Sequence, residues 1–595
     1  MLNSGLIQDA EAGGWWQFGN AAEIIVIDSV EKVPPALRQI EERVNREGLW
    51  AAGFISYEAG PGFDPAIRAR SPAPWPLLWM GLYPPPQLIQ LPVQPPAEAG
   101  PAYEWQASVS RQQYDQAIGT VRNLISRGDT YQVNYTLRLQ SAIQESPEAL
   151  FSRMIRANQP KHGAYLDCGN FVVCSASPEL FFRLNGERIT SRPMKGTAGR
   201  GLMHADDIDS ARRLAGSEKD RAENLMIVDM VRNDLSRISR TGSVLAPRLF
   251  DLERYPTLWQ MTSTVSAESD ASVCDIMQAL FPPASITGAP KVRTTEIIAE
   301  LESTPRGIYT GCIGYIAPGR RAQFNVAIRT AVVDRDRGIV EYGVGGGIVW
   351  DSRSQPEYDE ALLKARIVTD ALPVFSLLET LLWEPMGGYF LVDEHLRRLA
   401  ESANYFGMEV ELSQVSKQLV EFSRELPRLP QRVRLLVDQN GKIHCEAFEL
   451  KESRSPVRLG IAAEPIDPAD PFLYNKTTHR EFYQRARASR PDCDDVVLWN
   501  ARGEVTETTI ANVVVELDGG KFTPPVECGL LPGVYRDWLL KRGEITERRI
   551  DLDDLRRASR IWVINSVRRW REALLVEHDA NLVGPVGLEP TTKGL

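Results

Sequence analysis

Two hydrophobic patterns alternate along the first 370 residues of the chain. Apolar residues recur every three to four positions in RQQYDQAIGTVRNLISRGD (111–129), which predicts an amphipathic helix. FVVCSAS (171–177) and GIVEYGVGGGIVW (338–350) are rich in β-branched residues and predict buried strands. LWAAGFISYEAG (49–60) predicts another buried strand that ends in a turn. Helices and strands alternate without an internal repeat, which predicts a domain of mixed helices and strands.

The pattern restarts near residue 371. PVFSLLETLLWE predicts a strand, GGYFLVDEHLRRLAESANYFG a helix and QRVRLLVDQNGKIHCEAFEL a hairpin. We therefore predict one domain over residues 1–371 and a second over 372–580. A Pro-rich stretch at 82–101 predicts a surface excursion within the first domain. Residues 581–595 show no periodicity, and we expect a disordered tail there.

The bulk composition excludes several functional classes. With 595 residues, 43% hydrophobic and 25% charged, the chain is long enough for several packed domains. Its net charge of -10 argues against a nucleic-acid partner. The seven cysteines are scattered without a CxxC pair, which favours reduced thiols over disulfides or a zinc site. Because we find neither a signal peptide nor a run of about eighteen apolar residues, we expect a cytoplasmic protein with no membrane partner.

Glutamates fall on two separate predicted helices, beside core residues. In EKDRAENLMIVDMVRNDL, Glu223 shares a helix face with apolar residues such as Met226. In QPEYDEALLKAR, the i, i+3 and i+7 spacing places Glu357, Glu360 and Lys364 on one face. A helix carboxylate is usually a solvated charge, so neither helix is informative alone. Together they predict a site for Mg²⁺, which takes carboxylate oxygens and keeps waters.

Other segments offer groups that bind anions. The small-residue turn in PPASITGAPKVRTTEII opens a predicted helix, whose N-terminus would attract anions. The glycines of GVGGG (343–347) could present backbone N–H groups, and Arg329 in NVAIRT could bind a carboxylate with two hydrogen bonds. GVGGG does not complete a GxGxxG motif and no helix follows it, so we reject a dinucleotide site. The implied ligand is small and polyanionic.

Seven motifs, in this order, resemble those of one enzyme family: SPELF, PMKGT, AENLMIVDMVRNDL, SITGAPK, YTGCIGY, NVAIRT and GVGGGIV. They look like the motifs of the chorismate-utilising enzymes, which include anthranilate, isochorismate and aminodeoxychorismate synthases. The resemblance is carried by residues 108–371, whereas 1–107 resembles the more variable N-terminal part of the family. The resemblance implies an α+β fold, in which the domain is layered from a β-sandwich and helices.

Lys195 in PMKGT decides which reaction the resemblance implies. Aminodeoxychorismate synthases carry a lysine here that attacks ring carbon C2 of chorismate, whereas anthranilate synthases carry alanine. By the same resemblance, Glu179 in SPELF would protonate the leaving C4 hydroxyl and then accept a proton from ammonia. We expect the Pro, Gly and Thr beside Lys195 to form a rigid turn that aims the amine.

The resemblance also assigns binding roles. Glu223 and Glu360 would hold Mg²⁺, with Glu357 close by. Gln260 departs from the family, because many relatives have a histidine there and an amide cannot carry a proton through a catalytic cycle. We find no glutaminase motif, so ammonia would come from a separate glutamine amidotransferase subunit or from solution. The carboxylates of chorismate would be bound by Tyr309, Arg329, Gly345, Gly346, Gly347 and Lys364.

One lysine stands out in the second domain. Lys476 lies in DPFLYNKTTHREFYQRA, just before a predicted helix. NARGEVTETTIANVVVE predicts a hairpin turn and a strand that carries Glu507 and Asn512, and CGLLPGVYR predicts a glycine loop that opens a helix. A lysine, an anion cradle and a carboxylate are the groups that pyridoxal phosphate requires.

This ordered set resembles the class IV aminotransferase family, which includes branched-chain and D-amino acid aminotransferases and aminodeoxychorismate lyase. It implies a two-part α/β fold like that of D-amino acid aminotransferase. Lys476 would bind pyridoxal phosphate covalently, and Glu507 would pair with its pyridinium nitrogen. The phosphate would be bound by Arg398, Leu531, Gly533 and Ser566.

The combination of the two resemblances favours consecutive reactions. Chorismate would be aminated to 4-amino-4-deoxychorismate, and a lyase would release pyruvate to give 4-aminobenzoate for folate synthesis. An anthranilate or isochorismate synthase with an appended aminotransferase remains an alternative, although Lys195 argues against it. A noncatalytic chorismate-binding subunit is another, although the intact reactive residues argue against that. A homodimer through the C-terminal domain is one option for the assembly.

Overall fold

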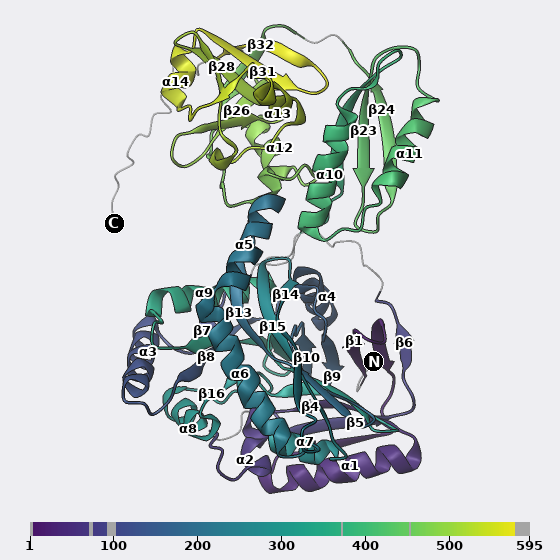
Figure 1. The fold of residues 1–595 in the computed structure, drawn as a ribbon, viewed down its shortest axis with the longest axis vertical. Helices are drawn as coiled ribbons and strands as arrows, with labels where there is room; N and C mark the ends of the chain where they lie inside the picture. Colours follow the sequence, from purple (N-terminus) through teal and green to yellow (C-terminus); the bar gives the residue numbers. More distant parts are fainter. Residues whose placement is uncertain (1–3, 71–74, 92–102, 370–372, 452–453, 577–595) are drawn as a thin grey trace, which may run out of the picture. The chain divides into compact units, whose positions relative to one another are not determined.

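The computed structural model describes residues 4–70, 75–91, 103–369, 373–451 and 454–576 (Figure 1). These residues form two compact units. The first unit contains Met1–Arg200 and Ser210–Pro373, and the second contains Gly201–Asp209 and Val374–Leu595. Part of the Pro-rich stretch, the domain boundary predicted at 371 and the predicted tail lie outside the described residues.

Two ten-stranded antiparallel sheets form the frame of the first unit. The order of the first sheet is β16 (Gly288–Ala289), β8 (Gln132–Ala142), β20 (Ile339–Ile348), β19 (Thr330–Asp334), β10 (Phe171–Ser175), β9 (Ala164–Asp167), β1 (Gly5–Asp9), β2 (Gly14–Phe18) and β6 (Gln87–Ile89), with β7 (Gln106–Ala107) beside β8. The order of the second is β13 (Met194–Gly199), β15 (Leu258–Glu268), β12 (Arg188–Arg192), β11 (Leu180–Asn185), β18 (Arg321–Val326), β17 (Cys312–Ala317), β4 (Trp50–Ile55), β5 (Leu78–Tyr83) and β3 (Glu23–Ile27), with β14 (Leu245–Arg254) beside β15.

The two sheets pack face to face, because one hydrophobic cluster contains residues of both, such as Ile7 of β1 and Phe54 of β4. Each outer face is covered by helices whose apolar side chains bury against it. The second sheet packs against α1 (Val33–Glu47), α6 (Glu218–Ser236) and α7 (Val273–Leu280). The first sheet packs against α3 (Arg111–Ser126), α4 (Pro147–Asn158), α8 (Lys291–Leu301) and α9 (Ser354–Thr369). The predicted layered fold of β-sandwich and helices is confirmed.

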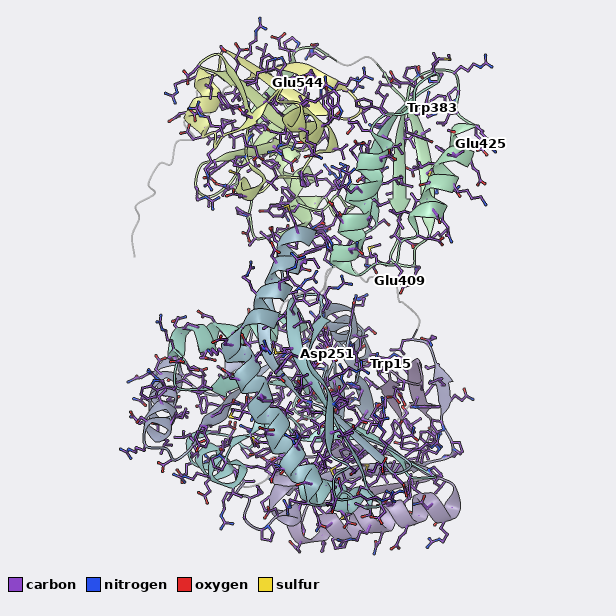
Figure 2. All side chains as sticks on the ribbon, viewed as in Figure 1. Trp15, Asp251, Trp383, Glu409, Glu425 and Glu544 are labelled. Atoms are coloured by element: carbon purple, nitrogen blue, oxygen red, sulfur yellow. The ribbon has the colours of Figure 1, made fainter. Side chains whose placement is uncertain are left out.

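The second unit begins with a four-stranded antiparallel sheet. Its order is β22 (Gly388–Tyr389), β21 (Leu377–Glu384), β23 (Gln431–Val437) and β24 (Ile443–Glu449). Two helices, α10 (Val392–Phe406) and α11 (Leu412–Ser423), bury their apolar faces in the same core, to which Trp383 of β21 belongs (Figure 2). In the described residues, no helix of either unit is both long and apolar enough to cross a membrane.

A closed six-stranded barrel forms the rest of the second unit. Its order is β27 (Val505–Thr508), β26 (Asp495–Trp499), β25 (Val457–Ile461), β32 (Arg569–Leu575), β31 (Arg560–Asn565) and β28 (Asn512–Leu517), and β28 pairs back to β27. The barrel is accompanied by β29 (Gly520–Thr523), β30 (Thr546–Glu547), α12 (Glu481–Ala488), α13 (Val534–Lys541) and α14 (Leu552–Arg557). The two-part α/β architecture is confirmed. The prediction that one strand carries both Glu507 and Asn512 is wrong. Glu507 lies on β27 and Asn512 on β28, and the two residues pair with each other across these strands.

Candidate functional sites

One cavity of the first unit, about 430 Å³ in volume, contains every site residue predicted for the first domain. Its walls come from segments far apart in the sequence, including β13, α6, β20 and α9. Gln260 of β15 also lines it. The predicted residues that line it are Glu179, Lys195, Glu223, Tyr309, Arg329, Gly345, Gly346, Gly347, Glu357, Glu360 and Lys364.

Lys195 projects into this cavity from a strand and not from a turn, which corrects the prediction. It belongs to β13, whose pairing with β15 shifts register between Met194 and Thr197, and Gly196 there has a φ of 95°. The Lys195 Nζ lies 3.3 Å from Glu223 Oε2. A Cβ on Gly347 would lie 2.3 Å from that Nζ, so a larger residue there would displace the amine from its present position.

Gln260 holds the backbone beside the lysine. Its Nε2 donates to Gly196 O at 2.8 Å, and its Oε1 accepts from the Thr197 hydroxyl at 3.1 Å. The glutamine side chain therefore fixes the irregular part of β13 with two hydrogen bonds that need no change of protonation.

Glu179 is a buried carboxyl group directly before β11, and it is 3% exposed. Burial raises its pKa to about 7, opposed by hydrogen bonds from Ser285 and the Met194 N–H and by the charge of Lys195. A carboxyl group with this pKa holds a proton for much of the time near neutral pH, so it can donate one to a leaving group.

Three carboxylates of the cavity could contribute to a metal site. The charge of Lys364, whose Nζ lies 2.9 Å from Glu360 Oε1, lowers the pKa of Glu360, whereas burial raises the pKa of Glu357. Within the described residues, no three His, Cys, Asp or Glu side chains are grouped to hold a metal ion unaided. The oxygen donors suit Mg²⁺ chemically, provided that water or substrate oxygens complete its coordination.

Arg329 is the best anion-binding group of this cavity. Its Nη1 donates to Asn158 Oδ1 at 3.1 Å, and its guanidinium lies 5.3 Å from the centre of the Tyr255 ring. No carboxylate pairs with Arg329 among the described residues, so its charge is available to a ligand. Lys364 differs, because it is bonded to Glu360 and donates to Gly345 O at 2.9 Å. The helix α8, predicted to receive anions, contributes no described residue to the wall.

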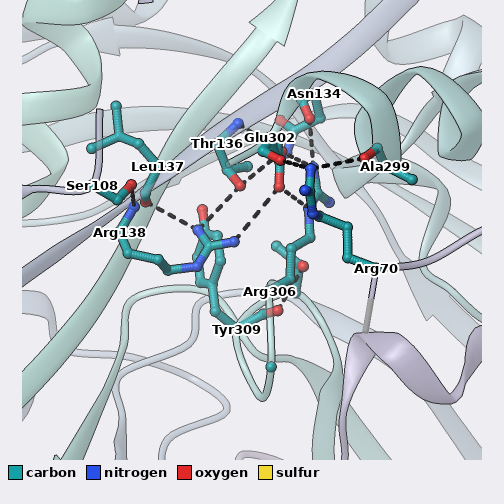
Figure 3. A network of polar contacts seen from close by, with 12 residues as sticks. Arg70, Ser108, Asn134, Thr136, Leu137, Arg138, Ala299, Glu302, Arg306 and Tyr309 are labelled. Atoms are coloured by element: carbon teal, nitrogen blue, oxygen red, sulfur yellow. Dashed lines mark hydrogen bonds and ion pairs between the residues drawn. The ribbon is translucent and has the colours of Figure 1, made fainter. Parts of the chain in front are cut away.

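A buried ionic network supports Tyr309 from behind the cavity (Figure 3). Glu302 accepts hydrogen bonds from the Thr136 N–H at 2.9 Å and from Arg306 Nη2 at 2.7 Å. The guanidinium of Arg138 lies 3.7 Å from Glu302 and 4.9 Å from the centre of the Tyr309 ring. One carboxylate thus compensates two guanidiniums that are each 2% exposed.

Glu302→Gln should lower the free energy of unfolding of the first unit by about 3–5 kcal/mol, because it leaves two buried guanidiniums without a counter-charge. Urea unfolding followed by tryptophan fluorescence measures this. The matched control is Glu296→Gln, whose pair with Arg293 is 37% exposed on both sides, and which should cost less than about 1 kcal/mol. Equal losses in the two variants would contradict a stabilising role for the network.

The second unit contains a cavity of about 380 Å³ at the barrel and the four-stranded sheet. All six residues predicted to bind pyridoxal phosphate line it, namely Arg398, Lys476, Glu507, Leu531, Gly533 and Ser566. Burial, followed by the charges of Arg398 and Arg480, lowers the pKa of Lys476 to about 7. An amine with this pKa is partly neutral at physiological pH, as a nucleophile requires.

Glu507 is a buried acid that lines the same cavity as this lysine. Its Oε1 accepts the Tyr483 hydroxyl at 2.7 Å and the Leu531 N–H at 3.2 Å, and burial raises its pKa to about 7. The Leu531 N–H, predicted to bind phosphate, is therefore bonded to Glu507 instead. A Cβ on Gly533 would lie 2.0 Å from Asn512 Oδ1, so this loop approaches the barrel closely.

A second carboxylate orients Arg398. Glu379, 1% exposed, accepts from Arg398 Nε at 2.9 Å and Nη2 at 2.6 Å, and lies 2.6 Å from His395 Nδ1. Burial opposes ionisation, but Arg398 and His395 lower the pKa of Glu379 to about 2. The Nε2 of His395 is buried and has no hydrogen-bond partner among the residues that the structure describes, although His395 lines the cavity. This unsatisfied nitrogen and the lysine that shares the cavity with a buried acid fit a polar cofactor such as pyridoxal phosphate.

Comparison with known families decides the class of the chain. The family described as chorismate binding enzyme matches residues 6–370, and the family described as amino-transferase class IV matches residues 376–575. The chain belongs to the chorismate binding enzymes. Its second unit is a class IV aminotransferase-like domain.

The matches between this chorismate binding enzyme and its individual relatives span only part of each chain. Aminodeoxychorismate synthase component 1 of Salmonella typhimurium is 39% identical over 270 residues, which are 45% of this chain and 59% of the relative. Aminodeoxychorismate synthase of Streptomyces griseus is 40% identical over 273 residues, 45% of this chain and 37% of the relative. The structure of anthranilate synthase component I from Streptococcus pneumoniae, at 22% identity and a TM-score of 0.52, covers 62% of this chain and 93% of its own, and shows the shared fold.

Sequence reasoning missed three polar residues of this chorismate binding enzyme. Ser285, within the SITGAPK motif, hydrogen-bonds to Glu179. Gln132 is fully buried, and in the described part of the chain neither polar atom of its amide has a hydrogen-bond partner. Its Nε2 would lie 2.9 Å from a Cβ on Gly347. His395 was overlooked in the second unit. Ser285 and Gln132 come close to predicted residues only through the fold, whereas the i, i+3 spacing of His395 and Arg398 on α10 is a local signal that could have indicated His395.

Proposed function

We propose that the first unit aminates chorismate at C4 to give 4-amino-4-deoxychorismate and water. The observation that carries the proposal is Lys195, which projects into the same cavity as Glu179 and lies 3.3 Å from Glu223. The 39–40% identity to two aminodeoxychorismate synthases supports it. Incubation with chorismate, Mg²⁺ and ammonium, followed by chromatography, tests it. Formation of anthranilate, or of no amino product, would refute it.

The reaction divides one displacement into two. The Lys195 amine attacks C2, both conjugated double bonds of the ring shift, and the C4 hydroxyl leaves as water with a proton from Glu179. Ammonia then adds at C4, the bond between C2 and Lys195 breaks, and Glu179 accepts a proton from the incoming nitrogen. Arg329 and Tyr309 would orient carboxylates of the substrate.

Mg²⁺ would be held by Glu223 and Glu360, with Glu357 close by, and would neutralise a substrate carboxylate. In the structure, Glu223 and Glu360 each bond a lysine of the same cavity. Binding of the ion would therefore displace these ammonium groups. Displacement of Lys195 from Glu223 would leave its amine available for attack.

Ammonia would be supplied by a separate glutamine amidotransferase. The Salmonella relative is itself named a component, which supports a division of labour between chains. Ammonium at high concentration should replace the partner.

We further propose that the second unit converts 4-amino-4-deoxychorismate to 4-aminobenzoate and pyruvate. Pyridoxal phosphate would supply an electron sink for the substrate carbanion. Lys476 would remove the proton at C4, and Glu507 would interact with the pyridinium nitrogen. Arg398 and Ser566 would bind the phosphate, together with the backbone at Gly533. The support is the convergence of these residues on one cavity and the presence of both family matches in one chain.

The amination rate should fall as pH rises through about 7, when the free ammonia concentration is held constant. Burial raises the pKa of Glu179 to about 7, so the proton needed by the leaving hydroxyl is present below that pH and lost above it. Initial rates between pH 6 and pH 9 measure the profile. Glu179→Gln should remove the fall in rate through pH 7 and lower the amination rate about 10²-fold. If the amination rate of that variant still fell through pH 7, the titrating group would be a residue other than Glu179.

A further inference from the structure

The second cavity is more cationic than one cofactor phosphate requires. Glu507 is its only acidic lining residue in the described part of the chain. A phosphate monoester carries at most two negative charges, and Arg398 and Ser566 already face the predicted phosphate region. The cationic residues that line the cavity are Arg398, Arg432, Arg434, Lys476, Arg480 and Arg568.

Strand β23 presents two of these arginines to the cavity by simple alternation. Val433 and Leu435 are fully buried in the core against α10 and α11, so Arg432 and Arg434, which alternate with them, point to the opposite face. On the neighbouring strand, Glu446 stands opposite Arg434, and their side chains form an ion pair at 3.0 Å. Phe448 stands opposite Arg432, with the guanidinium 4.8 Å from the ring centre. Arg432 is therefore held in place by a ring that leaves its charge uncompensated.

Arg480 is the second uncompensated arginine, and it lies nearer the reactive lysine. Its guanidinium lies 4.3 Å from the centre of the Tyr483 ring and donates to Thr509 O. Tyr483 in turn is bonded to Glu507. The charge of Arg480 also contributes to the lowered pKa of Lys476. Among the described residues, neither Arg480 nor Arg432 forms an ion pair with a carboxylate.

We propose that Arg480 and Arg432 bind the two carboxylates of one substrate, Arg480 the carboxylate nearer Lys476 and Arg432 the one at the exposed end of the cavity. The inference rests on the proposed function and deepens it, because 4-amino-4-deoxychorismate carries one carboxylate on the ring and one on the enolpyruvyl group. An amino acid with an apolar side chain has a single carboxylate and would leave Arg432 without a partner. These two arginines thus select a dicarboxylate substrate.

The test uses the full chain loaded with pyridoxal phosphate and two inert probes of similar size. These are 3-(carboxymethoxy)benzoate, with two carboxylates, and 3-ethoxybenzoate, with one. The absorbance of the bound cofactor is the readout, because it reports the second cavity even if the first also binds the probes. The dicarboxylate should bind about tenfold more tightly, as expected for one charge-assisted hydrogen bond that is partly exposed. Arg432→Gln should abolish this difference, and Arg480→Gln should weaken binding of both probes.

Arg428→Gln is the matched control, since it removes the same charge from an exposed position that does not line the cavity. It should keep the tenfold preference. Equal binding of the two probes to the unsubstituted protein, or a preference that survives Arg432→Gln, would overturn the inference. A protein that takes up no pyridoxal phosphate would overturn the proposed function and this inference with it. Uptake of one equivalent of pyridoxal phosphate by each variant shows that it is folded.

Discussion

Lys195→Ala should lower the rate of chorismate amination at least about 10³-fold, or redirect the reaction to another product, because it removes the nucleophile that divides the displacement into two steps. The effect should fall on the chemical step. Lys195 has no assigned contact with the chorismate carboxylates, so Mg²⁺-dependent binding of chorismate should persist. Single-turnover kinetics and calorimetric titration with chorismate measure the two properties separately.

Lys219→Ala is the matched control for this variant. Lys219 also pairs with Glu223, at 4.0 Å, but its side chain is 59% exposed. The Lys219→Ala substitution removes one positive charge from beside Glu223 and leaves the proposed nucleophile in place. It should change the amination rate less than about threefold. Full activity of Lys195→Ala would eliminate covalent catalysis by this residue. Equal losses in both variants would indicate a purely electrostatic role.

Lys476→Ala should abolish release of pyruvate from 4-amino-4-deoxychorismate, with a loss of at least about 10³-fold, because the variant lacks both the covalent attachment point and the proton-transfer group. Borohydride reduction of the loaded protein followed by peptide mass spectrometry gives a readout that does not depend on activity. The pyridoxyl group should be found on the peptide that contains Lys476, and the variant should carry none.

Lys417→Ala provides the control for the second unit, since its side chain is 77% exposed on α11. It should keep both the label on Lys476 and the activity. A visible cofactor band that is unchanged in Lys476→Ala would exclude this lysine as the attachment point. Amination by the first unit should be unaffected by either substitution, because its proposed residues all lie in the other cavity.

Much of the fold follows from local patterns. The β-branched run at 171–177 forms β10, and the amphipathic segment at 111–129 forms α3, because burial of one face stabilises each. Lys195 is the instructive exception. Pro193 and Gly196 are typical of turns, yet pairing with β15 keeps the segment in a strand and confines the glycine to an irregularity. Local signals could not indicate that long-range pairing.

The residues of the two sites could be proposed from motifs, but their partners could not. The i, i+3 and i+7 spacing predicted that Glu357, Glu360 and Lys364 share one helix face, and all three line one cavity. The bond between Lys195 and Glu223, and the carboxylate of Glu379 behind Arg398, join residues that no periodicity relates. The pKa values of Glu179, Lys476 and Glu507 could not be predicted from the sequence either, because burial in the assembled fold shifts them.

The most direct test of the central claim supplies the full chain with chorismate, Mg²⁺ and ¹⁵N-ammonium, with and without pyridoxal phosphate, and identifies products by mass spectrometry. We predict ¹⁵N-labelled 4-amino-4-deoxychorismate without the cofactor, and labelled 4-aminobenzoate with an equal amount of pyruvate when the cofactor is present. Labelled anthranilate would contradict the assignment of the first unit. Accumulation of 4-amino-4-deoxychorismate despite bound cofactor would contradict the assignment of the second.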